Sequence, residues 1–273
     1  ISAGSAAGET GSIDVQAPGI ANEGTISADA ATGQAGRINL ISAERTILGP
    51  GSRVSAAGID NASGGRVIVN TLGGRTSFAS SAVLDVSSGA RGGDGGFAEL
   101  SGQTIGLNGQ VRLSGVGQRG ELLIDPRDLF IVGSGDDDAL LSDRLVEFDE
   151  DGSTPPVEDA SLSASMIEAA LAGGDVRLQA TRDVFVNTAL GLLAPNALTI
   201  EAGRDISVDN PISDVAGDLT FDAGRDVLIN APIDYLNPTK TFTVEANRNI
   251  AVNQPISNAG RVTLHSDFNG NND

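Results

Sequence analysis

The chain has 273 residues and a formal charge of −19, which arises from 36 acidic and 17 basic side chains. This excess of negative charge argues against nucleic acid or an anionic membrane surface as a partner, because like charges repel. Cysteine is absent, which excludes a disulfide framework and a thiol site. Because 40% of the residues are hydrophobic but only 3% are aromatic, the core must be built from Val, Ile, Leu and Ala. The sequence has no signal peptide and no apolar run of the roughly 18 residues that a membrane helix needs, so we expect no membrane insertion.

From Ile1 to Val132, glycine repeatedly precedes alternating aliphatic residues. The pattern begins at Gly11, Gly36, Gly65, Gly96 and Gly120, at uneven intervals. Because residues i and i+2 of a strand face the same side, each such segment offers two apolar side chains to one interior. We therefore predict wide coils made of strands. Shorter strands are expected in the same coils at residues 25–28, 46–48, 53–55, 83–86, 104–107 and 110–113.

Residues 133–160 interrupt this pattern with an acidic loop insertion that holds ten acids and one base. Clustered carboxylates suit Ca²⁺, which prefers oxygen ligands. Their spacing does not match an EF-hand loop, however. We therefore predict a solvated acidic excursion and no dedicated metal site. The calcium alternative would use Asp136, Asp137, Asp138, Asp149 and Asp151.

Residues 161–174 are predicted to form a short helix. Ser165 and Glu168 have the spacing of a capping box at the helix start. Gly173 is expected to end the helix. The apolar face of this helix would consist of Ile167, Ala170 and Leu171.

From residue 175 to residue 273, one motif recurs at a nearly constant interval. Its copies open at Val176, Leu198, Leu219, Phe242 and Val262. Each copy begins with two apolar residues separated by one outward residue, and most copies then carry a second alternating pair. A period of roughly 20 residues is typical of a solenoid, in which each coil buries its apolar rows against the next coil, whereas a β-propeller has a repeat unit about twice as long. The residues predicted to face inward are Leu198, Ile200, Ile206, Val208, Leu219, Phe221, Val227 and Ile229.

Two polar features recur once per coil in this block. One is an Arg-Asp or Arg-Asn step, which predicts an exposed stripe of ion pairs within or between coils. The other is an Asn or Asp at a corner, where such residues bond their own main chain and stack from coil to coil. The steps are Arg182-Asp183, Arg204-Asp205, Arg225-Asp226 and Arg248-Asn249, and the corner residues are Asn187, Asp209, Asn230 and Asn253.

These patterns predict an all-β fold, a parallel β-helix (solenoid) with one short helix and an acidic loop insertion. The predicted organisation has four parts. They are a β-helix block with wide glycine-rich coils (1–132), the acidic loop (133–160), the helix (161–174) and a β-helix block with regular coils (175–273).

Three motifs in the first block resemble, in order and spacing, those of the filamentous-haemagglutinin-like exoproteins (TpsA-type adhesins) of Gram-negative two-partner secretion. The motifs are Gly64 to Val69, Gly92 to Gly102 and Glu121 to Pro126, and residues 161–176 resemble the short helix and strand that recur in that family. The resemblance covers nearly the whole chain and implies a right-handed parallel β-helix that is secreted and acts at the cell surface. Asn70 stands where many relatives have Trp, and Glu121 where they have Gly.

The family's amino-terminal secretion domain is missing from this sequence. The chain begins with Ile1 rather than Met, and its last coil stops soon after Val262. We therefore expect a processed product or a piece of a longer chain.

The sequence predicts no catalytic residues and no cofactor. Its only histidine, His265, lies in the last coil, and cysteine ligands are lacking, so neither a Ser-His-Asp arrangement nor a zinc site is expected. A polysaccharide lyase or hydrolase is the enzymatic alternative. It is disfavoured by the absence of Trp, the single Tyr and the lack of an isolated carboxylate pair.

We therefore predict an extracellular, non-catalytic structural or adhesive segment of a secreted bacterial surface protein. The alternative is the subunit of an extracellular filament that stacks head to tail through open coil ends, because unpaired strand edges seek partners. The expected partners are further copies end to end or neighbouring solenoid segments, together with a cell-surface glycan or protein receptor. Neither nucleic acid nor membrane is expected.

Overall fold

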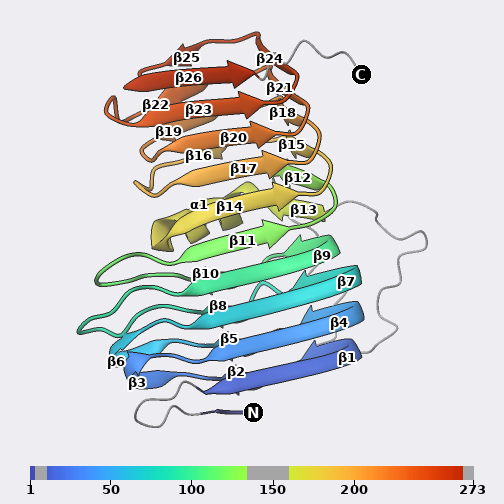
Figure 1. Ribbon diagram of the computed structural model, residues 1–273, viewed down its shortest axis with the longest axis vertical. Helices are drawn as coiled ribbons and strands as arrows, with labels where there is room; N and C mark the ends of the chain where they lie inside the picture. The colour runs from blue at the N-terminus through green and yellow to red at the C-terminus, as the bar shows by residue number, and fades with distance from the viewer. Residues whose placement is uncertain (4–10, 134–159, 267–273) are drawn as a thin grey trace.

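The computed structural model describes residues 1–3, 11–133 and 160–266, and shows a solenoid of parallel strands that carries one helix. The strands stack along one axis, from β1 (Ser12–Asn22) at the bottom to β26 (Arg261–Ser266) at the top (Figure 1). Three faces surround the main hydrophobic core, and we name them the front, side and back faces.

The front face turns toward the viewer in Figure 1, and each of its strands pairs in parallel with the next. It contains the first parts of β1 and three other long strands, followed by six shorter strands. In order along the axis, the strands after β1 are β4 (Arg37–Leu48), β7 (Arg66–Phe78), β9 (Phe97–Leu107), β11 (Glu121–Asp125), β14 (Asp175–Ala180), β17 (Leu198–Ala202), β20 (Leu219–Ala223), β23 (Thr241–Ala246) and β26.

The side face continues the same sheet, because the four long strands turn a corner at irregularities in their register. Above their second parts lie β13 (Ala160–Ser163), β12 (Leu129–Val132), β15 (Val184–Val186), β18 (Ile206–Val208), β21 (Asp226–Ile229) and β24 (Asn249–Val252).

The back face holds two short stacks of strands, with the helix between them. The lower stack is β2 (Thr25–Ser27), β5 (Arg53–Ser55), β8 (Val83–Asp85) and β10 (Gln110–Arg112). Above the helix α1 (Ala164–Gly173) are β16 (Leu190–Gly191), β19 (Ile212–Val215), β22 (Ile233–Tyr235) and β25 (Ile256–Ser257). A separate pair, β3 (Ala30–Gln34) and β6 (Gly58–Ser63), leaves the coil between the back and front faces.

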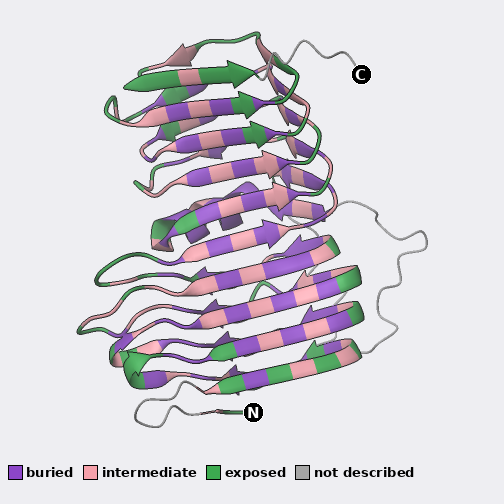
Figure 2. Cartoon of the chain, viewed as in Figure 1, coloured by how far each residue is buried: buried purple, intermediate pink, exposed green. Residues whose placement is uncertain are grey.

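The core consists of inward rows that match from coil to coil. Leu198, Leu219 and Phe242 are partners on successive strands, and alternate residues of each strand are buried (Figure 2). All eight residues predicted to face inward in the second block are at most 1% exposed, so the predicted register is confirmed. The six shorter strands predicted in the first block are also present, two of them as the second parts of β4 and β9.

The helix forms where it was predicted, but its predicted capping box is wrong. Ser163, not Ser165, is the N-cap, and its Oγ accepts a hydrogen bond from the Met166 N–H at 3.3 Å. Glu168 points elsewhere and accepts from the Gly191 N–H at 2.9 Å. The chain enters α1 directly from β13, so the residue that leaves the strand takes the cap position. The three apolar residues predicted to face the core are buried.

A column of glycines marks the corner between the back and front faces. A Cβ atom on Gly65 would lie 2.0 Å from the Gly36 carbonyl oxygen, and one on Gly96 would lie 2.1 Å from the Gly65 carbonyl oxygen. Gly36 stands in the same relation to Gly11, and Gly174 to Gly120. Only glycine lets the backbone of successive coils approach this closely, which explains why glycine precedes the front-face strands.

The C-terminal coil leaves inward-facing side chains uncovered. Val262 and Leu264 of β26 are 43% and 46% exposed, whereas their partners Phe242 and Val244 one coil below are fully buried. In Figure 2 the topmost front strand is accordingly mostly green. The edges of β24, β25 and β26 have no further strand above them in the described part of the chain.

Candidate functional site

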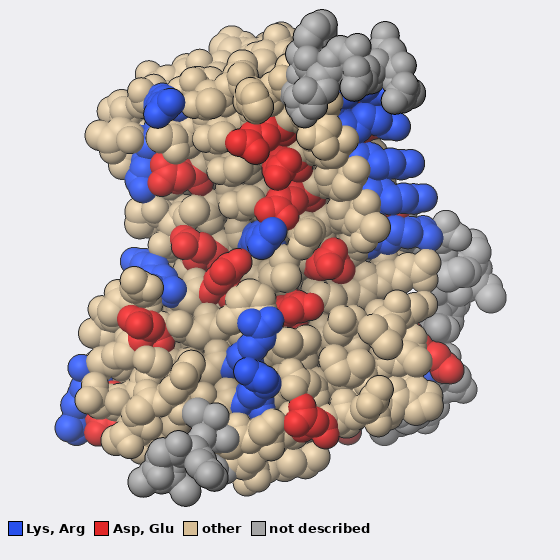
Figure 3. Space-filling model, in the orientation of Figure 1, with Lys and Arg blue, Asp and Glu red and all other residues tan. Residues whose placement is uncertain are grey.

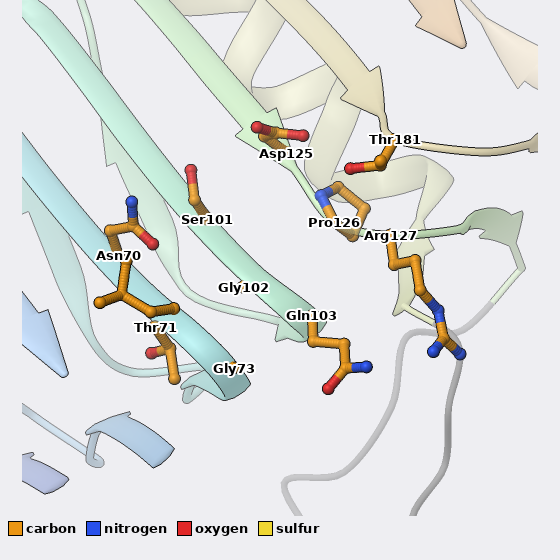
Figure 4. Close-up of a pocket in the computed structure, with 11 residues that line it drawn as sticks. Asn70, Thr71, Gly73, Ser101, Gly102, Gln103, Asp125, Pro126, Arg127 and Thr181 are labelled. Atoms are coloured by element: carbon orange, nitrogen blue, oxygen red, sulfur yellow. The ribbon is translucent and has the colours of Figure 1, made fainter. Parts of the chain in front are cut away.

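A polar groove of about 430 Å³ lies at the corner between the front and side faces, where the wide coils meet the regular ones. We call it the corner groove. Its lining residues are Asn70, Thr71, Leu72, Gly73, Ser101, Gly102, Gln103, Asp125, Pro126, Arg127 and Thr181. Figure 4 shows Asn70, Ser101 and Asp125 on neighbouring strands, and Gln103 and Arg127 where the chain leaves the front face. The three strand residues are register partners that point outward, so the ladder itself brings them together.

Asp125 is the one carboxylate in the lining of this groove. Burial and the nearby charge of Glu99 raise the pKa of Asp125, and Arg177 opposes this effect. Ser101, the neighbour of Asp125 on β9, donates its hydroxyl hydrogen bond to Glu99 at 3.0 Å. The carboxylates of Asp125 and Glu99 therefore lie close enough for their charges to interact, and Ser101 holds the second of them.

Buried hydroxyl groups fix the wall behind the groove. Thr71 donates to Thr46 at 3.0 Å and lies 2.9 Å from the Thr76 hydroxyl, while Ser42 bonds to both Thr46 and Thr71. The Thr76 hydroxyl then donates to the Ser101 carbonyl at 2.8 Å. This network satisfies the polar groups that the corner would otherwise bury without partners.

We expect Asp125→Asn to leave stability unchanged or to increase it. The raised pKa means that the ionised carboxylate is less favourable in the folded chain than in the unfolded one, so removing the charge removes that cost. Urea unfolding at pH 7 followed by circular dichroism measures the effect. A clear decrease in the free energy of unfolding would show that the carboxylate has a stabilising partner.

A ladder of ion pairs rises from this groove along the upper coils. The arginines of four successive coils each bind, through Nε and Nη2, both oxygens of the aspartate one coil below. The pairs are Arg182 with Asp128, Arg204 with Asp183, Arg225 with Asp205, and Arg248 with Asp226. We call this set the Arg–Asp ladder.

The Arg–Asp ladder buries its acids and exposes its bases. The aspartate side chains are 4–22% exposed and the arginine side chains 42–57%. Backbone N–H groups also donate to the carboxylates, as from Asp205 to Asp183 at 3.1 Å. The predicted stripe of ion pairs is present, but its carboxylates are part of the coil corner rather than exposed, and Figure 3 shows only a column of basic side chains at this edge.

Sequence reasoning missed the first member of the ladder. Asp128 is 3% exposed and accepts from Arg182 and from the Asp183 N–H. The signal was present, since Arg127-Asp128 precedes an aliphatic pair just as Arg182-Asp183 does. The acidic insertion separates the two copies and hides the period. At the upper end Asn249, in place of an acid, donates to Asp226 at 2.9 Å.

We expect acid to loosen the Arg–Asp ladder. The hydrogen bonds from Arg225 and Arg248 hold the pKa values of Asp205 and Asp226 below the ordinary value of 3.8. A depressed pKa contributes stability that is present above the unfolded value and is lost as the pH falls through the folded value. The midpoint of thermal unfolding should therefore fall steeply only below a pH of about 4.

Asp205→Asn should cost about 1 kcal/mol at pH 7 and flatten this acid dependence, because it removes the charge that Arg225 pairs with. Asp222→Asn is the matched control. The pKa of Asp222 is raised by burial and by Glu245 and Glu201, so its substitution should not destabilise the protein at pH 7. Equal losses for both variants would contradict the proposed role of the ladder.

The upper front face carries a second charged column. Glu201, Asp222 and Glu245 are register partners in one outward row of β17, β20 and β23, where Figure 3 shows acidic side chains in line. Arg177 pairs with Glu201 at 2.7 Å. Within the described residues, Asp222 and Glu245 form no ion pair.

The structure tests few of the predicted site residues. The calcium candidates Asp136, Asp137, Asp138, Asp149 and Asp151 lie outside the described residues. Within residues 1–3, 11–133 and 160–266, no three His, Cys, Asp or Glu side chains are arranged to hold a metal ion. The predicted stacking of corner residues from coil to coil is present at three of them, since Asn230 donates to Asp209 and Asn253 to Asn230, both at 2.8 Å. The one described helix is too short to span a membrane.

Comparisons with protein families, with characterised proteins and with solved structures found no match for this chain.

Proposed function

We propose that this chain is a right-handed parallel β-helix that serves as a structural or adhesive, non-catalytic segment of a secreted bacterial surface protein of the filamentous-haemagglutinin-like type. The observation that carries the proposal is the unbroken core. One cluster of buried residues runs from Ile13 to Ala246 and follows the same rows through every coil between them. A solenoid whose coils all bury their neighbours is a stiff rod, which suits a spacer or a support for contacts at its surface.

The motifs that carry the family resemblance occupy structural positions here. Gly65 and Gly96 belong to the glycine column, and the Arg66 guanidinium carbon lies 4.1 Å from the centroid of the Phe97 ring on the front face. Asp125, at the end of the third motif, lines the corner groove. In these positions the motif residues shape and pack the coils. This supports a family resemblance in the geometry of the coils and not in a shared reaction. The corner groove is the place we assign to an adhesive contact with a glycan or protein receptor.

A second candidate function is the subunit of an extracellular filament. Such a subunit would stack through Val262 and Leu264 of the last described coil, because a further coil would bury both. At the opposite end, β1 carries Ile13 and Val15 in the same two inward rows. A copy placed above β26 would continue these rows, and repetition of such a head-to-tail contact gives a fibre.

Electron microscopy of the protein isolated from its native source, with the mass of the denatured chain, separates these candidates. Uniform fibres built from a chain of 27.6 kDa, the mass of these residues, would establish the filament subunit. A much larger chain, seen as single rods that continue into other domains, would establish a segment of a surface protein. A compact particle with hydrolytic or lyase activity toward polysaccharides would overturn both. Calorimetric titration with Ca²⁺ tests the acidic insertion separately.

A further inference from the structure

The strands of the side face do not follow the order of the chain. Along the axis their order is β9, β13, β12 and β15, although β12 precedes β13 in the sequence. β9 and β12 come before residues 134–159, whereas β13 and β15 come after them. Strands from the two parts of the chain therefore alternate on this face.

The other two faces show no such alternation. The front face runs β9, β11, β14 and β17, and the back face runs β8, β10, α1 and β16, both in chain order. On the side face, β12 therefore lies one coil further along the axis than chain order would place it. The position between β9 and β12 is occupied by β13, which comes later in the chain. The repeat supports this placement, because Asp128, just before β12, is bound by Arg182 and so forms the lowest pair of the same ladder that β15 and β18 continue.

The alternating strands are tightly joined. Leu162 of β13 lies between Leu107 of β9 and Ile131 of β12 in one inward row, and all three are at most 1% exposed. Outside the core, the rings of Phe130 on β12 and Phe185 on β15 stack with centroids 4.8 Å apart.

Polar contacts close the same junction from both parts of the chain. Asp128 is held by Arg182, and the Arg119 Nη1 donates to the Ala172 carbonyl at the end of α1 at 3.0 Å. On the other side of the helix, Asn196 Nδ2 donates to the Leu171 carbonyl. The element that follows β13 is therefore anchored to a residue before the insertion and to one after it.

We propose that β12 and β13 interlock the two parts of the solenoid, the block of strands before residues 134–159 and the block of strands after them, so that these blocks hold together without the covalent connection between them. Three strand ladders join the blocks on the side face, namely β9 with β13, β13 with β12, and β12 with β15. An ordinary boundary between coils has one ladder per face. Neither block can be lifted off without also pulling a strand out from between two strands of the other.

Cutting the folded protein tests the interlock. A protease recognition sequence is placed within residues 134–159, and the purified, folded protein is cleaved there. We expect the two pieces to run as one particle in size-exclusion chromatography and native mass spectrometry. They should separate only at the urea concentration that unfolds the uncut protein.

The control cut lies in the turn between β22 and β23, within residues 236–240, where chain order and axial order agree. There the upper piece is joined by one ladder on each face, β20 with β23, β21 with β24 and β22 with β25. We expect this piece to leave at a lower urea concentration than the pieces of the first cut. Separation of the first cut without urea, or at no higher urea concentration than the control, would overturn the interlock. Because this test concerns the joining of two blocks, its outcome does not depend on the proposed surface role.

Discussion

Phe221→Ala is expected to lower the free energy of unfolding by about 3–5 kcal/mol, because it leaves a cavity in the middle of the upper core. Phe221 is fully buried and meets Phe242 one coil above in an edge-to-face contact, with centroids 5.2 Å apart and an angle of 87° between the rings. The loss therefore removes both buried area and an aromatic pair. Urea unfolding followed by circular dichroism measures it.

The control for this substitution is Thr220→Ala, since Thr220 is the neighbouring residue on β20 and points outward. Its effect should stay within about 0.5 kcal/mol. A similar loss for the two variants would mean that β20 does not turn Phe221 toward the core.

Gly65→Ala is expected to destabilise the lower coils by about 3 kcal/mol or more, because the added methyl group has no space. Its Cβ would lie 2.0 Å from the Gly36 carbonyl oxygen and 2.8 Å from the Ala35 carbonyl group, and both belong to backbone that is itself held between strands. The cause is the close approach of two coils and not a left-handed backbone, since Gly65 is not among the residues with positive φ. Thermal and urea unfolding of the purified variant measure the loss.

Gly24→Ala is the matched control, because no atom lies within 4 Å of the position that its Cβ would take and its φ is not positive. This variant should be neutral or gain less than about 1 kcal/mol, since alanine restricts the unfolded chain more than glycine does. If Gly65→Ala were as stable as Gly24→Ala, the glycine column would not limit the spacing of the coils.

The regular upper coils could be predicted residue by residue, and the reason is physical. Strand alternation fixes which side chains face inward, and a slip by one residue would turn every aliphatic side chain of a strand outward. Phe221 and Ile229 were therefore placed correctly by pattern alone. The glycines before the front-face strands were also visible in the sequence, although the carbonyl contacts that require them appear only when the coils are stacked.

The junction between the blocks could not be predicted in the same way. Alternation shows that β12 and β13 are strands, but it carries no information about which strand lies beside which. The reversed order of β12 and β13 therefore became visible only in the ladder, and with it the place of Asp128 beneath Arg182. The N-cap was misplaced for a related reason, since Ser163 and Ser165 both fit a helix start and the preceding strand decides between them.

The corner groove was missed because it has no motif of its own. Asn70 and Asp125 lie far apart in the sequence and meet only through the register of β7, β9 and β11. Gln103 of β9 joins this surface at the corner of the coil. With its amide nitrogen facing Gly73, it donates to the Gly73 carbonyl at 3.0 Å and accepts from Arg127 at 3.1 Å.

On the front and side faces, the strands of the upper coils pair residue for residue, so the rod can lengthen or shorten only by whole coils. Each coil adds one strand to every face and about 4.8 Å to the axis. Removal of residues 204–224 would bring Arg225 above Asp183 and Val227 above Val184, so the ladder and the inward row would both close across the gap. Duplication or loss of one such unit of coding sequence would therefore lengthen or shorten the rod without altering its cross-section. An insertion that is not a whole coil has to leave the cylinder, as the excursion with β3 and β6 does.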